Sequence, residues 1–210
     1  MRPSQSRQSL IYELPSIIER LDLSQLFAVE QPIELELGSG DGSFLVQYAA
    51  VHKERNFIGL ERLLGRLQKT ARKAKRAGLV NLMGIRIESS YFLEYLLPSS
   101  AICALHIYFP DPWPKRKHRA NRLINERFPE LASSVLQTGG SVYLRTDDSD
   151  YFEQMQRVFA SSSLFQEIDT PSDLAGILTD FEKDFIAQRI RTLRAAYQLV
   201  GAVQRELKHQ

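Results

Sequence analysis

The 210-residue chain is 43% hydrophobic and 25% charged, the proportions of a soluble globular protein, and its net charge of +2 says little about partners. It contains no apolar run long enough to span a membrane and no secretory apolar region near its amino terminus. Its one cysteine, Cys103, excludes an internal disulfide and fits a reducing compartment, and its four histidines lack metal-ligand spacing, so no zinc site is expected.

The amino-terminal part of the chain predicts a strand that opens into a glycine-rich turn. Residues 1–30 are expected to form a helical extension, in which residues 13–21 make an amphipathic helix with a proline near its start. Residues 32–37 alternate apolar and charged side chains, as a strand does, and the glycines of residues 38–43 follow at once. Alternate glycines let the backbone turn tightly and let a ligand approach it, and a helix is expected over residues 44–51.

Acidic residues follow the next strands. A strand over residues 56–60 ends in Glu61, where an acidic side chain in nucleotide-binding folds reaches ribose hydroxyls. A strand over residues 81–87 ends in Glu88, which is equally well explained as an acceptor for the adenine amino group or as a solvated carboxylate. The glycine spacing is G-x-G-x-G, a weak signal by itself, with Glu36 before it and no pyrophosphate-binding run after it. This pattern favours a ligand with adenosine but no pyrophosphate, and S-adenosylmethionine is the obvious candidate.

Two basic runs stand out in this nearly neutral chain. The first runs from Lys53 to Arg76 and includes a helix after Glu61 that carries leucine and alanine on one side, cations over the rest, and Gly78 at its end. The second covers Lys115 to Arg122. Together they indicate a side that faces phosphates, although either run alone is equally well explained by a solvated helix face or a charged loop.

The most distinctive stretch is the loop Phe109-Pro110-Asp111-Pro112-Trp113-Pro114, which follows a predicted buried strand over residues 102–109. Its alternate prolines fix φ, remove backbone donors and push the residues between them into extended conformations, so the loop is stiff. It carries one carboxylate, Asp111, and the only tryptophan of the chain. Ligands of open α/β sheets bind outside the carboxyl ends of strands, so chemistry is expected here; the alternative is an ordinary proline-rich turn.

The rest of the chain continues the alternation of helices and strands. A helix over residues 122–137 is expected to end at Gly139-Gly140, and a strand over residues 141–146 places Asp147 at its end. A helix over residues 150–159 and a strand over residues 164–168 follow. A last helix is expected to include Ile186, Ile190, Leu193, Ala196 and Tyr197. The alternation predicts the α/β class, with a doubly wound, mostly parallel sheet and helices on both faces, in a single domain.

Taken together, these residues resemble the bacterial tRNA (guanine-N(7)-)-methyltransferases, a family of Rossmann-like enzymes that depend on S-adenosylmethionine. The resemblance covers about residues 33–185, and its most specific part is residues 108–122, YFPDPWPKRKHRANR. It implies a cytoplasmic enzyme that methylates N7 of the variable-loop guanine at tRNA position 46, giving 7-methylguanosine and S-adenosylhomocysteine. The sequence departs from the family at Glu88, where aspartate is usual, before Thr179, where Arg-Pro is missing, and in a divergent carboxyl-terminal helix over residues 186–210.

The resemblance also implies roles for individual residues. Asp111 matches the active-site residue, which also contacts the cofactor. The other cofactor-binding positions are Glu36, Gly38, Gly40, Glu61 and Glu88. The substrate-binding positions are Lys115, Asp147, Thr179, Phe181 and Glu182. Separately, the cations expected to contact the tRNA backbone are Arg66, Lys69, Lys73, Arg116 and Arg119.

Methylation of guanine N7 requires alignment of the reacting atoms rather than a general base, because N7 carries an in-plane lone pair and no proton. Asp111 is expected to accept hydrogen bonds from the N1 and N2 edge of guanine, and Trp113 is expected either to stack on a base or to pack under the loop. One alternative is methylation of an exocyclic amine, whose loops read [DNS]-P-P-[YFW], with Trp113 and Pro114 here in reversed order. Others are a non-catalytic RNA-binding subunit and a dehydrogenase. The sequence leaves monomer and homodimer open.

Overall fold

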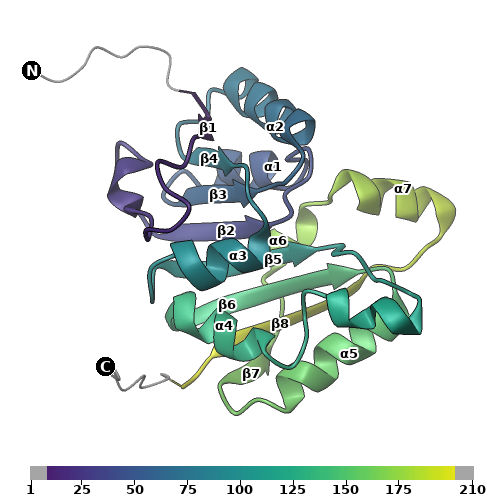
Figure 1. Cartoon of the computed structure of the whole chain (residues 1–210). Helices are drawn as coiled ribbons and strands as arrows, with labels where there is room; N and C mark the ends of the chain where they lie inside the picture. The colour runs from purple at the N-terminus through teal and green to yellow at the C-terminus, as the bar shows by residue number, and fades with distance from the viewer. Residues whose placement is uncertain (1–8, 202–210) are drawn as a thin grey trace, which may run out of the picture.

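The computed structural model describes residues 9–201, which form one eight-stranded sheet in the order β1-β4-β3-β2-β5-β6-β8-β7. The strands from β1 to β6 in this order run parallel, and β8 is antiparallel to both of its neighbours (Figure 1). The strands are β1 (Ile11–Tyr12), β2 (Ile33–Leu37), β3 (Asn56–Leu60), β4 (Leu82–Ile85), β5 (Ile102–Tyr108), β6 (Leu136–Thr146), β7 (Phe165–Ile168) and β8 (Leu193–Leu199). The predicted α/β class with a doubly wound, mostly parallel sheet is confirmed.

Helices cover both faces of the sheet. The longer ones are α1 (Leu45–Val51), α2 (Leu64–Arg76), α4 (Phe128–Val135), α5 (Ser149–Ala160) and α7 (Asp180–Gln188). The shorter turns are η1 (Leu23–Gln25), α3 (Ser89–Tyr91), η2 (Phe92–Leu96), η3 (Arg116–Asn121) and α6 (Ser172–Gly176). Because successive strand residues point to opposite faces, Leu105 and Ile107 of β5 pack in the core with α4, α5 and η2, whereas Tyr108 packs with α1 and α6.

The order of the strands creates a switch point at the carboxyl edge of the sheet. From β2 the chain moves outward through β3 and β4, and then returns to the other side of β2 as β5. Connections therefore leave β2 and β5 in opposite directions, and ligands of doubly wound sheets bind at such a point. In Figure 1 the arrowheads of the central parallel strands point to the right, where α7 lies beyond the ends of β5 and β6.

The helix predicted over residues 13–21 is wrong. The chain instead pairs Ile11 and Tyr12 with the edge of β4, and only bends and the short η1 follow. The hydroxyl of Ser16 accepts the N–H groups of Ile18 and Glu19, which is a local turn that competes with a helix. The apolar side chain of Ile18 is 83% exposed, so burial does not favour the predicted helix.

The helix predicted over residues 122–137 is also wrong at both ends. Residues 116–121 form the 3₁₀ turn η3, α4 begins only at Phe128, and β6 already starts at Leu136 and runs through both glycines. Gly139 does adopt φ +78°, but inside a strand rather than after a helix. A Cβ at Gly140 would lie 3.1 Å from the carbonyl oxygen of Cys103 in β5, so glycine here permits close approach of strands.

Among the described residues the last predicted helix is right only in its first part, and residues 202–210 of the prediction lie outside the described residues. The helix α7 ends before Arg189, which adopts φ +59°, and residues 193–199 form β8 between β6 and β7. The apolar spacing that suggests a helix comes partly from Ile186 and Ile190, which are exposed, and partly from strand residues that are buried in the sheet. The other predicted strands and helices are confirmed within a few residues. No helix within residues 9–201 is both long and apolar enough to cross a membrane.

Candidate active site

The glycine turn after β2 has the shape of a ligand cradle. Gly38 and Gly40 adopt φ values of +75° and +57°, and a Cβ added at either would meet nothing within 4 Å. Both positions therefore need glycine for the turn and leave the backbone open to a ligand. Gly42 differs, because a Cβ there would lie 2.5 Å from Cγ2 of Thr70, so this glycine allows α2 to pack against the turn.

Glu36, at the end of β2, is a buried carboxylate with an unused oxygen. The residue is 4% exposed, and its Oε2 has no hydrogen-bond partner among the described residues; the buried hydroxyl of Ser39 also has none. Burial raises the pKa of Glu36 to about 8, and the charges of Asp41 and Glu61 act in the same direction against the opposing Arg145. A buried acid next to an open turn fits a ligand that brings a positive group, such as the ammonium of an amino-acid cofactor.

The raised pKa of Glu36 predicts that ligand binding releases a proton. Near pH 7 we expect Glu36 to be largely protonated in the free protein and to ionise when an ammonium group binds beside it, releasing up to about one proton. Titration calorimetry with S-adenosylhomocysteine in buffers of different ionisation enthalpy measures that number. The Glu36→Gln variant is expected to release fewer protons, and equal release by both proteins would contradict the assignment.

The other two predicted cofactor carboxylates lie at the ends of neighbouring strands. Glu61 follows β3, is 7% exposed and accepts the N–H of Leu63 with Oε1 at 2.8 Å, which leaves Oε2 without a partner among the described residues. Glu88 follows β4 and is exposed. It caps α3 by accepting the N–H groups of Ser90 and Tyr91 at 3.0 and 2.7 Å, a structural role that the sequence does not predict. Both carboxylates keep lone pairs for a ligand.

The loop after β5 is strained on both sides of Asp111. Phe109 and Trp113 adopt φ values of +52° and +43°, which bulky side chains rarely do. Strain of this kind persists only where the surroundings impose it, and it concentrates at functional sites. Asp111 itself is exposed, and its side chain makes no hydrogen bond or ion pair within residues 9–201. The loop therefore presents a free carboxylate on a rigid backbone.

Arg122 holds this loop in place. Its side chain is 1% exposed, donates to the carbonyl oxygen of Pro112 at 2.7 Å and pairs with Asp150 at 2.6 Å. The guanidinium also donates to Gln154 at 2.8 Å and lies 4.6 Å from the ring centre of Tyr151. A buried arginine among surface cations of the same run carries no distinguishing sequence signal, so this role is visible only in the structure.

Trp113 is partly covered and contacts His118 of η3. Its ring lies edge-on to that of His118, with 5.8 Å between the ring centres, and the side chain remains partly exposed. The exposed part of the ring leaves stacking on a base available to this residue.

A buried polar network joins β5 to the start of β2. His106 of β5 is fully buried, with Nε2 2.6 Å from Oε2 of Glu34 and Nδ1 2.8 Å from the hydroxyl of Tyr108. Arg55 donates to Oε1 of Glu34 at 2.5 Å. Burial alone raises the pKa of Glu34, but His106 and Arg55 outweigh it and the pKa lies below its ordinary value. These contacts join β5 to the amino-terminal part of β2 in the interior of the sheet.

Thr179, Phe181 and Glu182 begin α7 and divide into two kinds. Thr179 and Glu182 are buried and form a reciprocal capping box, in which each side chain accepts the backbone N–H of the other. Glu182 also accepts from Arg145 at 2.8 Å and from Arg194 at 2.7 Å. Phe181 is 57% exposed, and its ring centre lies 6.0 Å from that of Phe109 at the start of the loop. The buried pair thus holds an exposed aromatic ring beside the loop that carries Asp111.

The predicted RNA-contacting residues differ in how free they are. Arg119 pairs with Asp150 at 2.8 Å, and Lys73 pairs with Asp41 at 2.8 Å. The other predicted cations, and the predicted substrate-binding carboxylate after β6, are exposed and have no ion-pair partner within the described residues. These free residues are Arg66, Lys69, Lys115, Arg116 and Asp147.

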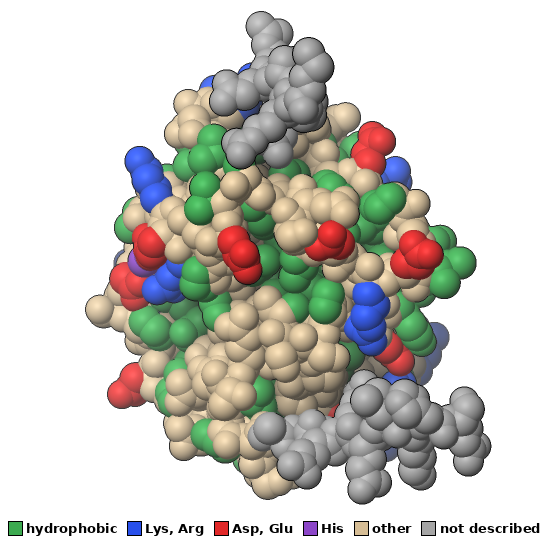
Figure 2. Space-filling model, turned by 90° about the vertical axis from the view of Figure 1, so that its left-hand side faces the viewer, with side chains coloured by type: hydrophobic (Ala, Val, Ile, Leu, Met, Phe, Trp, Pro, Cys, Tyr) green, Lys and Arg blue, Asp and Glu red, His purple; other side chains and the backbone are tan. Residues whose placement is uncertain are grey.

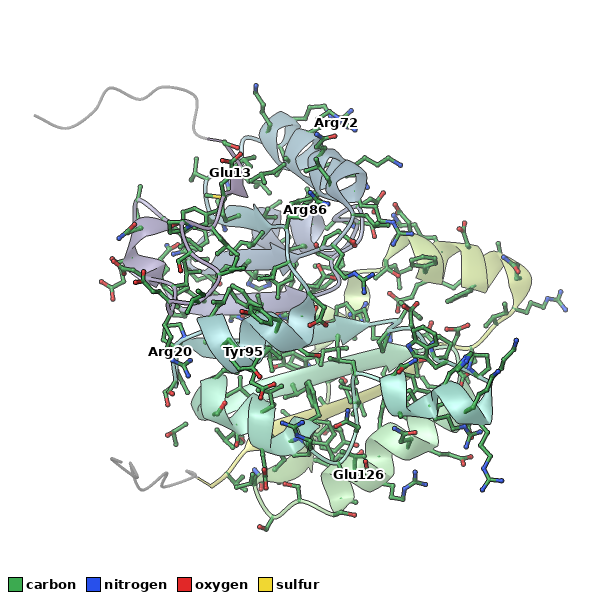
Figure 3. The ribbon with its side chains drawn as sticks, viewed as in Figure 1. Glu13, Arg20, Arg72, Arg86, Tyr95 and Glu126 are labelled. Carbon is green, nitrogen blue, oxygen red and sulfur yellow. The ribbon has the colours of Figure 1, made fainter. Side chains whose placement is uncertain are left out.

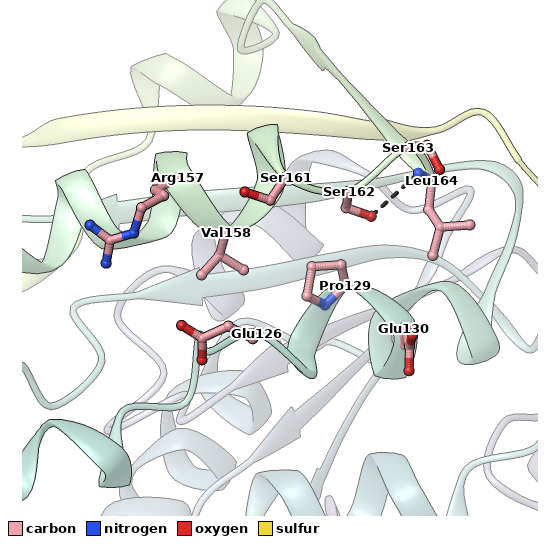
Figure 4. Close-up of a pocket in the computed structure, with 9 residues that line it drawn as sticks. All are labelled: Glu126, Pro129, Glu130, Arg157, Val158, Ser161, Ser162, Ser163 and Leu164. Carbon is pink, nitrogen blue, oxygen red and sulfur yellow. Dashed lines mark hydrogen bonds between the residues drawn. The ribbon is translucent and has the colours of Figure 1, made fainter.

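Cations gather on the outer side of α2, where Arg72 projects away from the sheet (Figure 3). The face at the amino ends of the parallel strands shows few Lys and Arg side chains among the described residues, mixed with Asp and Glu (Figure 2). A cavity of about 700 Å³ lies between Pro129 of α4 and the turn at residues 161–164 (Figure 4). It contains none of the predicted site residues, and no cluster of potential metal ligands occurs within residues 9–201.

A parallel sheet with an open glycine turn after its central strand and carboxylates at the ends of neighbouring strands defines a Rossmann-like methyltransferase. Solved structures agree on the fold. A 16S rRNA methyltransferase, KamB, aligns with a TM-score of 0.61 at 19% identity over 84% of this chain and 91% of its own. The aminoglycoside resistance methyltransferase NpmB1 aligns with a TM-score of 0.54 at 16% identity over 85% of this chain and 92% of its own.

The sequence matches a family described as putative methyltransferase over residues 30–194. A tRNA (guanine-N(7)-)-methyltransferase of Sodalis glossinidius is 35% identical over 73% of this chain and 64% of its own length, and one of Syntrophotalea carbinolica is 32% identical over 82% and 76%. One of Thermotoga maritima is 33% identical over 69% of this chain but only 46% of its own length. The chain belongs to the tRNA (guanine-N(7)-)-methyltransferase family.

Proposed function

We propose that the protein transfers the methyl group of S-adenosylmethionine to N7 of a guanine in tRNA, giving 7-methylguanosine and S-adenosylhomocysteine. The observation that carries the proposal is Asp111, an exposed carboxylate without a partner among the described residues, on a strained loop at the same sheet edge as the open glycine turn. The proposed reaction is the one for which the relatives are named. The chain spans 64% of the length of the Sodalis relative.

The cofactor residues fit the parts of S-adenosylmethionine by charge and shape. The unpartnered oxygen of Glu36 and the open turn at Gly38 and Gly40 hold its amino-acid end. Glu61 and Glu88 provide acceptors for ribose hydroxyls and for the adenine amino group. When bound, the cofactor supplies an electrophilic methyl group on a sulfonium centre.

The substrate residues orient guanine rather than activate it, because N7 already carries a free lone pair. Asp111 accepts hydrogen bonds from the N1 and N2 donors of the base, and the stiff loop keeps the base aligned with the methyl group. Phe181 presents its ring beside the loop, and Asp147 offers a further free acceptor after β6. Held in this way, the reacting atoms need little further reorganisation, which accounts for several kcal/mol of barrier lowering.

The free cations hold the RNA. Lys115 and Arg116 follow the loop directly, and Arg66 and Lys69 extend the basic surface along α2. Such a surface recognises folded RNA through its phosphates while one loop base is drawn into the site. By the family resemblance the target is the variable-loop guanine at tRNA position 46, and the protein works in the cytoplasm.

Lys115→Ala is expected to weaken tRNA binding and to make that binding less dependent on salt. Removal of one phosphate contact lowers the slope of log affinity against log salt by about 0.7 to 0.9. Filter binding of unmodified tRNA across salt concentrations measures the slope. Lys53→Ala is the matched control, because this exposed lysine precedes β3 at the opposite end of the sheet from Lys115, although the sequence pattern includes it in the first basic run. An unchanged slope for Lys115→Ala would remove this residue from the RNA contact.

The direct test is incubation of the protein with methyl-labelled S-adenosylmethionine and unmodified tRNA, followed by nucleoside analysis. We expect the label in 7-methylguanosine within the variable loop. Label in another nucleoside, such as one methylated on an exocyclic amine, would retain methyl transfer and discard the guanine N7 target. Binding of tRNA without any label would support a non-catalytic RNA-binding protein instead.

A further inference from the structure

Lys73 lies between two parts of the site that are distant in the sequence. It stands on α2, and its ammonium is 2.8 Å from Oδ2 of Asp41 in the glycine turn and 3.7 Å from Oδ2 of Asp180, the first residue of α7. Its side chain is 31% exposed, so the two ion pairs are partly shielded from water. The cation that the basic pattern assigns to RNA phosphates is therefore already engaged by two carboxylates.

Further contacts join the same two parts. The N–H of Asp180 donates to the hydroxyl of Ser43 at 3.2 Å, and Nε2 of Gln47 donates to the carbonyl oxygen of Leu178 at 3.2 Å. Ser43 lies at the end of the glycine turn, and Gln47 lies in the first turn of α1. The start of α7 thus rests directly on the cofactor turn, and this start carries Phe181.

The charges explain why Lys73 matters for this arrangement. Asp41 adds its negative charge to those near the buried Glu36, and Asp180 brings another carboxylate from α7, where it also pairs with Lys183 at 2.9 Å. If Lys73 is removed, no cation lies between the carboxylates of Asp41 and Asp180. Repulsion would then oppose the seating of α7 on the turn.

We propose that Lys73 is a positioning residue that couples occupancy of the cofactor turn to the seating of α7, and through Phe181 to binding of the RNA substrate. This inference rests on the proposed function. A ligand that orders the turn fixes Asp41 and Ser43, so α7 loses less conformational freedom when it docks on them. By reciprocity, substrate that favours the docked α7 tightens cofactor binding by the same factor.

Hydrogen exchange with S-adenosylhomocysteine tests the coupling without any turnover. In the wild-type protein the ligand is expected to slow amide exchange over residues 178–186 by about fivefold or more, the lower end of typical couplings. Lys73→Met should abolish this slowing, Lys73→Arg should restore most of it, and Lys75→Met, an exposed lysine of the same helix, should leave it unchanged. Calorimetry should show that Lys73→Met binds S-adenosylhomocysteine about fivefold or more weakly than the wild type, because loss of the coupling costs the ligand the same factor, and that Lys75→Met keeps the wild-type affinity.

Binding of unmodified tRNA distinguishes this role from a phosphate contact. We expect S-adenosylhomocysteine to tighten tRNA binding to the wild type by about fivefold or more and to leave the affinity of Lys73→Met unchanged. The inference would be overturned if Lys73→Met bound tRNA more weakly and with a smaller salt dependence, but S-adenosylhomocysteine still tightened its tRNA binding as much as in the wild type. So would ligand binding to the wild type without slower exchange in α7, which leaves the proposed function standing. Failure of the wild type to bind the ligand at all would overturn the proposed function and this inference with it.

Discussion

Asp111→Ala is expected to lower the rate of methyl transfer by about a hundredfold, the order of loss that a misplacement of the reacting base by about 1 Å causes. The side chain is exposed and has no partner within residues 9–201, so the substitution should change the free energy of unfolding by no more than about 0.5 kcal/mol. Single-turnover kinetics with saturating tRNA and urea unfolding measure the two quantities.

Two companion measurements sharpen this result. The affinity for S-adenosylhomocysteine decides whether Asp111 contacts the cofactor as well as guanine, because only a cofactor contact lowers it in Asp111→Ala. Glu126→Ala removes another exposed carboxylate, beside the cavity between α4 and α5, and is expected to keep normal turnover (Figures 3 and 4). An Asp111→Ala protein with wild-type rates would eliminate Asp111 as the active-site residue.

The central part of the fold is predictable from sequence because its signals are local. The strand over 32–37, its glycine turn and its helix reflect alternation, positive φ and helical spacing within about twenty residues. The errors arise where partners are distant. Residues 193–199 become a strand because β6 and β7 accept them on both sides, and residues 11–12 pair with the free edge of β4. The spacing of apolar residues along the chain does not indicate pairing with strands that are distant in the sequence.

The candidate site shows the same division. Loop residues such as Asp111 and turn residues such as Gly38 can be identified from the sequence, because the neighbouring prolines and glycines indicate an unusual backbone conformation. The ion pairs that organise the site join residues 37, 32 and 28 positions apart: Arg145 with Glu182, Lys73 with Asp41, and Arg122 with Asp150. A charge pattern predicts a basic surface but does not say which cation is already paired. For this reason sequence alone does not single out Arg122 or Arg145, and it assigns Lys73 to RNA.

Arg145 depends on Glu182 for its charge balance, and Glu182→Ala is therefore expected to destabilise the protein by about 3 to 5 kcal/mol. Both residues are 1% exposed, and their N–O distance is 2.8 Å. Removal of the carboxylate leaves a buried guanidinium whose remaining acceptors are the carbonyl oxygens of Ile177 and Leu174, and it also breaks the capping box of α7. Urea unfolding at pH 7 measures the loss. Asp184→Ala, an exposed acid on the same helix, should change stability by less than about 0.5 kcal/mol.

The dependence on pH identifies the charge as the cause. Burial raises the pKa of Glu182, but the N–H of Thr179 and the guanidinium groups of Arg145 and Arg194 outweigh it, so the pKa lies below its ordinary value. The folded protein then binds fewer protons here than the unfolded chain, and this contribution is full above the ordinary glutamate pKa of about 4.3 and fades as pH falls through the folded pKa. The stability gap between wild type and Glu182→Gln should therefore narrow in acid. A constant gap would point to lost packing, whereas normal stability with weakened tRNA binding would make Glu182 a direct substrate contact.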